Sequence, residues 1–194
     1  MNIEVCEVLA NVEYVDELTK KKVVTKEFIP LYGYEDFQTA EAVFSCKSGV
    51  LKIHLVGKEK NPGKILAKVK KNGTPAVWND DCYEIMLVNP TGTDYIQIIV
   101  NSIGTYYSKP FHRMPLGNYK IKANGNVAPE FGNWTLDLEI PLAQFNPNRL
   151  KGIWKVNIFR NRRTSDPKAY QASGLYLKEL HFHKLEQFFT LIID

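Results

Sequence analysis

Short runs in which apolar and polar residues alternate recur along the chain. Every second residue is apolar in 51–55, 134–140 and 154–158, and residues 96–100 are apolar at nearly every position. A period of two is typical of β-strands that place one face on a core. The span 81–101 holds two such runs around Asn-Pro-Thr-Gly-Thr, which predicts a β-hairpin with a five-residue loop.

Turn signals separate these runs, and helical periodicity is almost absent. Asn72-Gly73 and Asn124-Gly125 are the strong turn dipeptides, and only 142–145 has room for a short helical turn before Asn146-Pro147. Many closely spaced strands predict an all-β fold, an antiparallel β-sandwich of two sheets in a jelly-roll-like or immunoglobulin-like arrangement with little helix. A chain of 194 residues suits one domain spanning 1–194.

Charge and hydropathy exclude some classes of function. The net charge of +4 is too small to indicate a nucleic-acid partner, and no run approaches the roughly 20 apolar residues of a membrane span. The N-terminus has neither a basic region nor a long apolar stretch, so it does not resemble a signal peptide. The lysine-rich stretch Lys58–Lys71 lacks arginine and interleaved aromatic residues, which favours a solvated edge or loop.

No complete set of catalytic residues stands out. The chain has no Gly-x-Ser-x-Gly and no glycine-rich phosphate loop. Glu84, Asp137 and Glu139 are candidate residues for glycoside hydrolysis, which requires two carboxylates facing across a cleft. His181 and His183 could share a strand face, but two ligands do not close a tetrahedral metal site. The sequence therefore favours a protein that is not an enzyme.

The stretch from Trp78 to Val88 carries the most distinctive chemistry. In the predicted strand 82–88, Tyr83, Ile85 and Leu87 share an apolar face, whereas Cys82, Glu84 and Met86 share the other. A straight strand would separate Trp78 from Glu84 by about 20 Å, so the two can meet one ligand only if the chain curls back at residues 79–81. Asp80 and Asp81 suit such a turn, and their carboxylates also suit calcium.

Five motifs in order resemble carbohydrate-binding module family 9, within the DOMON-like β-sandwiches. The family is similar in having Trp-x-Asp-Asp before a strand bearing Glu, then Asn-x-x-Gly, a Trp-initiated strand closing in Glu-Ile-Pro, an Asn-aromatic-Arg strand and a His-containing segment before the last strand. The matching stretches are Trp78 to Glu84, Asn101 to Gly104, Trp134 to Pro141, Asn157 to Arg160, and Phe182-His183 followed by Phe188 to Ile193. The resemblance covers roughly the last two thirds of the chain.

The resemblance implies a site in which two aromatic rings sandwich a sugar at a chain end. Trp78 corresponds to the first ring, and Tyr176 stands near where the family tends to have a second tryptophan. Glu84, Asn101 and Arg160 would hold the hydroxyl groups of the sugar. Because relatives often hold calcium, the resemblance also implies a calcium site at the two aspartates that follow Trp78, and it implies a secreted or cell-surface location.

We therefore expect non-catalytic binding of an oligo- or polysaccharide, without nucleic acid or membrane insertion. Two alternatives remain. Some relatives are attached to xylanases, which leaves a polysaccharide-processing enzyme such as a glycoside hydrolase. Some DOMON relatives bind haem through methionine and histidine, and Met86 would be the methionine.

Overall fold

The computed structural model describes residues 23–24, 28–30, 40–114, 116–117, 119–146, 152–163, 169–172 and 183–193. These residues form strands joined by loops and by short 3₁₀ turns of three to five residues. The elements, in chain order, are β1 (Val23–Val24), β2 (Ile29–Pro30), β3 (Ala40–Lys47), β4 (Val50–Lys58), η2 (Pro62–Lys64), η3 (Pro75–Asn79), β5 (Cys82–Val88), β6 (Tyr95–Asn101), β7 (Tyr106–Phe111), β8 (Lys122–Ala128), η4 (Pro129–Phe131), β9 (Asn133–Pro141), η5 (Leu142–Gln144), β10 (Gly152–Arg162), β11 (Ala169–Ala172), η6 (Leu185–Gln187) and β12 (Phe189–Ile193).

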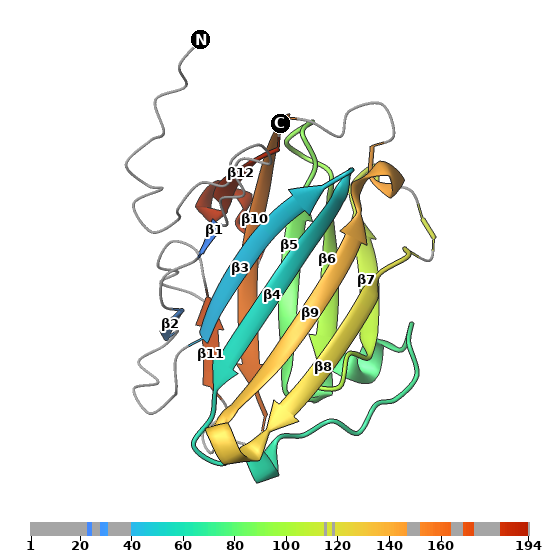
Figure 1. The fold of residues 1–194 in the computed structure, drawn as a ribbon. Helices are drawn as coiled ribbons and strands as arrows, with labels where there is room; N and C mark the ends of the chain where they lie inside the picture. Colours follow the sequence, from blue (N-terminus) through green and yellow to red (C-terminus); the bar gives the residue numbers. More distant parts are fainter. Residues whose placement is uncertain are drawn as a thin grey trace.

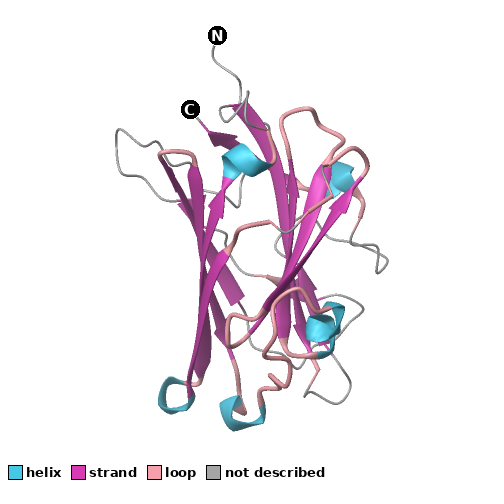
Figure 2. Ribbon diagram, turned by 90° about the vertical axis from the view of Figure 1, so that its right-hand side faces the viewer, coloured by secondary structure: helices cyan, strands magenta, loops and turns pink. Residues whose placement is uncertain are grey.

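The strands make two antiparallel sheets stacked face to face (Figures 1 and 2). The first sheet has the order β1-β3-β4-β9-β8, and it is the nearer layer in Figure 1. The second has the order β2-β11-β10-β5-β6-β7. The predicted hairpin is β5 paired with β6, and the predicted two-sheet β-sandwich is confirmed. Within the described residues, no helix is long and apolar enough to cross a membrane.

The longest strand, β10, has two partners along one of its edges. Residues 152–156 pair with β12, and residues 159–162 pair with β11. Its other edge pairs with β5 over residues 155–161. Both flanks of β10 are thus hydrogen-bonded, which places it and β5 in the centre of the second sheet.

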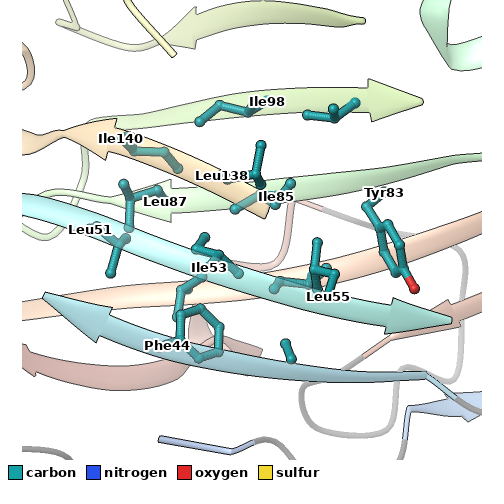
Figure 3. Close-up of a cluster of buried hydrophobic side chains, with 14 of the residues drawn as sticks. Phe44, Leu51, Ile53, Leu55, Tyr83, Ile85, Leu87, Ile98, Leu138 and Ile140 are labelled. Carbon is teal, nitrogen blue, oxygen red and sulfur yellow. The ribbon is translucent and has the colours of Figure 1, made fainter. Parts of the chain in front are cut away.

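The core lies between the two sheets and is built mainly from every second residue of β3, β4, β5, β6, β9, β10 and β12 (Figure 3). Trp134 and Trp154, both predicted to be core residues, are 1% and 0% exposed. The predicted core face of β5 is confirmed as well, because Tyr83, Ile85 and Leu87 pack in this cluster. Period-two alternation therefore identified the inward residues correctly on the strands it located.

The outer face of the first sheet is polar and open to water. Lys52 and Lys122 both form ion pairs with Glu139, and His54 contacts Asp137 at 2.7 Å. These side chains are between 36% and 81% exposed, so each pair adds little stability. The polar residues between the apolar positions of 51–55 and 134–140 thus face solvent.

A charged cluster is buried at the end of the core where β4 leaves the sheet. Glu59 accepts hydrogen bonds from Arg162 Nη2 at 2.7 Å and Arg162 Nε at 2.9 Å, and Arg160 Nη2 lies 3.4 Å from it. The Arg160 guanidinium also lies 5.6 Å from the ring centroid of Trp134 and donates to the carbonyl of Lys58. Removing one partner of such a cluster would leave an uncompensated charge in the interior.

One predicted turn is wrong. Asn124-Gly125 lies inside β8, whereas Asn72-Gly73 does form a turn, with Gly73 at φ +77°. A Cβ atom on Gly125 would stand 2.1 Å from the carbonyl oxygen of Ser102. Gly125 is therefore required for the close approach of two backbones rather than for turn geometry. The predicted short turn at 142–145 corresponds to η5.

The packing at Gly57 in β4 generates a stability prediction. A Cβ atom there would lie 2.6 Å from Tyr83 Oη, 2.9 Å from Trp134 Nε1 and 3.0 Å from Arg160 Cζ. We expect Gly57→Ala to lower the free energy of unfolding by about 1–3 kcal/mol through overpacking. Gly63→Ala is the control, because no atom lies within 4 Å of its Cβ position. Equal denaturation midpoints for the two variants would contradict this description of the core.

Candidate functional site

The outer face of the second sheet is buried along β5, unlike the outer face of the first sheet. Every residue of β5 is buried. At one end Cys82 and Ile99 pack with Val77 and Val69 from the β4–β5 connection. At the other end Met86 and its neighbours pack against Phe188. Between these two apolar clusters lies a polar patch, which we define as Glu84, Gln97 and Asn161.

Glu84 is the centre of the polar patch and is 5% exposed. Its Oε2 accepts a hydrogen bond from Gln97 Nε2 at 2.6 Å, and its Oε1 accepts one from Asn161 Nδ2. Burial raises the pKa of this carboxyl above 4.5, although the two amides and the charge of Arg163 act in the opposite direction. The fold therefore keeps a carboxylate in a poorly hydrated position, which is typical of functional sites.

Trp78 lies on η3 and is 51% exposed. The guanidinium of Arg163 lies 5.6 Å from the centroid of its ring, and Arg163 Nε donates to the Trp78 carbonyl at 3.1 Å. The charge of Arg163 also acts on Glu84. Arg163 thus contacts the residue that bears the exposed indole ring and acts on Glu84 through its charge. The chain curls at residues 79–81 rather than running straight from Trp78 to Glu84.

Asp80 and Asp81 hold the β4–β5 connection against the sheet. Asp80 is 1% exposed and accepts hydrogen bonds from the backbone N–H groups of Lys68 and Val69, each at 3.0 Å. Asp81 accepts from the N–H of Leu66 and of Arg163, both at 2.6 Å. Within the described residues, no group of three or more His, Cys, Asp or Glu side chains is arranged to hold a metal. Calcium binding by the two aspartates stays a prediction.

Asn101 is fully buried and joins the same anchor. Its Nδ2 donates to Asp80 Oδ2 and to the carbonyl of Val69, both at 2.9 Å. Its Oδ1 accepts from the N–H groups of Ile103 and Thr105. The amide therefore uses its two donors and two acceptor positions within the chain, which gives Asn101 a role in positioning the loop beside Trp78.

The structure separates Arg160 from the other predicted site residues. The register pairs Arg160 with Tyr83, so its side chain lies on the inner face of the sheet, whereas Glu84 lies on the outer face. Arg160 is 0% exposed, and burial lowers the pKa of its guanidinium. Tyr176, the predicted second ring, lies outside the described residues. Their assignments to sugar binding are untested.

Three residues of the site were missed by sequence reasoning: Gln97, Asn161 and Arg163. Asn161 directly follows Arg160 and therefore faces the opposite side of β10, next to Cys82. Its Oδ1 is buried and makes no hydrogen bond within the described residues. Gln97 is the one polar residue of 96–100, but only the β5–β6 pairing and its hydrogen bond show that it contacts Glu84.

The haem alternative gains no support from the surroundings of Met86. Met86 is 0% exposed and packs in an apolar cluster with Phe159 and Phe188. The nearby His183 accepts or donates a hydrogen bond at Nδ1 with the hydroxyl of Tyr95, at 2.8 Å.

Two solved structures have a fold similar to that of this chain. No family model and no curated protein matches the sequence. The structure is similar to that of a Bacteroides uniformis protein whose proposed role is carbohydrate binding, with a TM-score of 0.66, 19% identity, and coverage of 87% of this chain and 86% of that one. It is also similar to a carbohydrate-binding module of family 9 from Caldicellulosiruptor kristjanssonii in complex with cellotriose, with a TM-score of 0.60, 12% identity, and coverage of 97% of this chain and 86% of that one. The chain therefore has a family 9-like fold.

The raised pKa of Glu84 predicts a particular dependence on pH. Because the folded state holds this proton more tightly than the unfolded chain, the contribution of Glu84 to the free energy of unfolding falls as pH rises from 4.5 through the folded pKa. Titration of the side-chain carboxyl carbon by NMR should give a midpoint above 4.5. Glu84→Gln serves to assign the resonance, and a midpoint at or below 4.5 contradicts the described burial.

The anchor role of Asp80 is tested by removing its carboxylate. Asp80→Ala leaves two backbone N–H groups and the Asn101 amide without their acceptor, so we expect a loss of about 2–4 kcal/mol in unfolding free energy. Asp137→Ala is the control, because its side chain is 62% exposed and its pair with His54 is worth about 1 kcal/mol or less. EDTA should leave the wild-type midpoint unchanged if the aspartates act as anchors alone, whereas a lower midpoint indicates calcium.

Proposed function

We propose that this chain is a non-catalytic carbohydrate-binding domain that holds a saccharide at Trp78 and the polar patch. The observation that carries the proposal is a half-exposed tryptophan whose ring and carbonyl both contact Arg163, a residue whose charge also acts on the buried carboxyl of Glu84. The likeness of the fold to carbohydrate-binding proteins, one of them bound to cellotriose, supports the same conclusion.

The indole ring of Trp78 supplies an apolar platform for the C–H face of a pyranose. A ring that is 51% exposed loses water-accessible apolar area when a sugar covers it, which favours binding. Arg163 packs on Trp78 and donates to its carbonyl, so the platform is held in place before the ligand arrives. A preorganised ring loses less entropy on binding than a mobile one.

The polar patch supplies hydrogen bonds to sugar hydroxyl groups. Glu84 contributes acceptor oxygens, and the amides of Gln97 and Asn161 orient the carboxylate. We assign Asn101 to the loop anchor, from which it positions Trp78 indirectly. The resemblance to family 9 adds the finer proposal that Tyr176 closes the pocket as a second ring and that the ligand is the end of a saccharide chain.

The partners of the carboxylates support binding rather than hydrolysis. The two oxygens of Glu84 are held by amides, and those of Asp80 and Asp81 accept backbone N–H groups. Glycoside hydrolysis requires two facing carboxylates, one of which must carry a proton to the leaving oxygen. The carboxylates of Asp80 and Asp81 are therefore occupied by hydrogen bonds from the backbone.

Calorimetric titration of Trp78→Ala with cellotriose and xylo-oligosaccharides tests the proposal. We expect wild-type binding and at least a tenfold loss of affinity in the variant, because an exposed aromatic platform is a typical binding hot spot. Phe131→Ala is the matched control, since Phe131 is an exposed aromatic residue (75%) on η4, between strands of the other sheet. Equal loss in both variants, or no saccharide binding by the wild type, contradicts the proposal, and release of reducing ends would favour the enzyme alternative.

A further inference from the structure

The β4–β5 connection carries an unusual concentration of positive charge. Residues 58–71 contain six lysines and one glutamate, so this segment has a formal charge of +5, which exceeds the +4 of the whole chain. All six lysines are exposed. The connection crosses the end of the sandwich that is lowest in Figure 1. The net positive charge of the protein is thus concentrated in one loop.

The basic loop is fixed in position beside the proposed sugar site. Asp80 and Asp81, which follow Trp78 in the chain, bind its backbone at Leu66, Lys68 and Val69. Val69 packs in an apolar cluster on the sheet, and the flanking Lys68 and Lys70 are exposed. The backbone at Lys68 and Lys70 is therefore held at a defined place next to the site.

Among the described residues, the acids next to this loop in the chain are directed at groups other than the side chains of Lys64, Lys68 and Lys70. Glu59 is buried and paired with two arginines. Asp80 and Asp81 are buried and accept backbone hydrogen bonds. Arg163, on the ring of Trp78, adds a further positive charge at the same edge. The surroundings of Trp78 therefore carry an excess of positive charge facing solvent.

We propose that the saccharide held at Trp78 belongs to an acidic polysaccharide, whose carboxylate or sulfate groups contact the basic loop formed by residues 58–71. This inference rests on the proposed function and specifies its ligand class. Trp78 and the polar patch hold one sugar unit, while neighbouring charged units of the same polymer lie along the loop and interact with Lys64, Lys68 and Lys70. A neutral glycan would gain nothing from this charge, whereas a polyanion gains both affinity and faster association.

Pairs of polymers that differ only in charge provide the test. Affinity gel electrophoresis and calorimetry would compare polygalacturonate with its methyl-esterified form, glucuronoxylan with unsubstituted xylan, and dextran sulfate with dextran. We expect the charged member of at least one pair to bind at least tenfold more tightly at low salt, with the advantage shrinking as salt screens the charges. Pairs with carboxylate and pairs with sulfate distinguish the two sources of negative charge.

Two variants with the same change of charge separate the loop from the overall charge of the protein. Lys64→Gln/Lys68→Gln/Lys70→Gln should reduce binding to the charged polymer about tenfold and leave binding to neutral oligosaccharides unchanged. The control is Lys47→Gln/Lys120→Gln/Lys122→Gln, because these exposed lysines lie toward the opposite end of the first sheet. The control should bind like the wild type.

The outcomes distinguish failure of this inference from failure of the proposed function. If the protein binds neutral saccharides through Trp78 and does not prefer the charged member of any pair, the proposed acidic ligand class is wrong. The proposed carbohydrate binding then still stands. Binding to charged polymers that survives Trp78→Ala and is displaced equally by duplex DNA shows a nonspecific polyanion surface and overturns the inference. No binding to any saccharide overturns both.

Discussion

The antiparallel register of β5 with β6 and β10 is the constraint on which the rest of the structure depends. Side chains alternate between the faces of a strand, so the pairing decides at once which residues enter the core and which meet on the outer face. It places Tyr83 opposite Arg160 in the interior, and it brings Glu84, Gln97 and Asn161 together outside. A shift of this pairing by one residue would turn the core side chains outward and the side chains of the proposed site inward.

One end of the outer face of this sheet is covered because the chain anchors a loop across it. Asp80 and Asp81 bind backbone N–H groups of the β4–β5 connection, and Asn101 joins the anchor from β6. Buried carboxylates that accept several hydrogen bonds tie segments together firmly, because any lost partner leaves a desolvated charge. One anchor thus positions both Trp78 and the basic loop, which connects the proposed sugar platform to the proposed preference for acidic ligands.

Two buried carboxylates, Glu59 and Glu84, differ in the partners that surround them. The carboxylate of Glu59, directly after β4, pairs inside the protein with Arg160 and Arg162 of β10. Among the described residues, Glu84 has only amides as hydrogen-bond partners, and burial raises its pKa. A carboxylate that destabilises the fold when ionised is expected at a position selected for binding rather than for stability. The contrast supports the assignment of the outer face, not the interior, to the ligand.

The sequence alone determined the two-sheet architecture and the core residues, because period-two alternation depends only on neighbouring positions in the chain. It also identified Trp78 and Glu84 as distinctive. It could not assign Arg160 to the interior or find Asn161. Adjacent residues of one strand face opposite sides, and only the pairing with β5 shows which of the two faces the core and which faces outward. It took Asn124-Gly125 for a turn, since the close backbone of Ser102 is distant in sequence. The tertiary structure alone decided that the two aspartates hold the lysine-rich loop beside Trp78, because those hydrogen bonds join residues 11 to 15 positions apart.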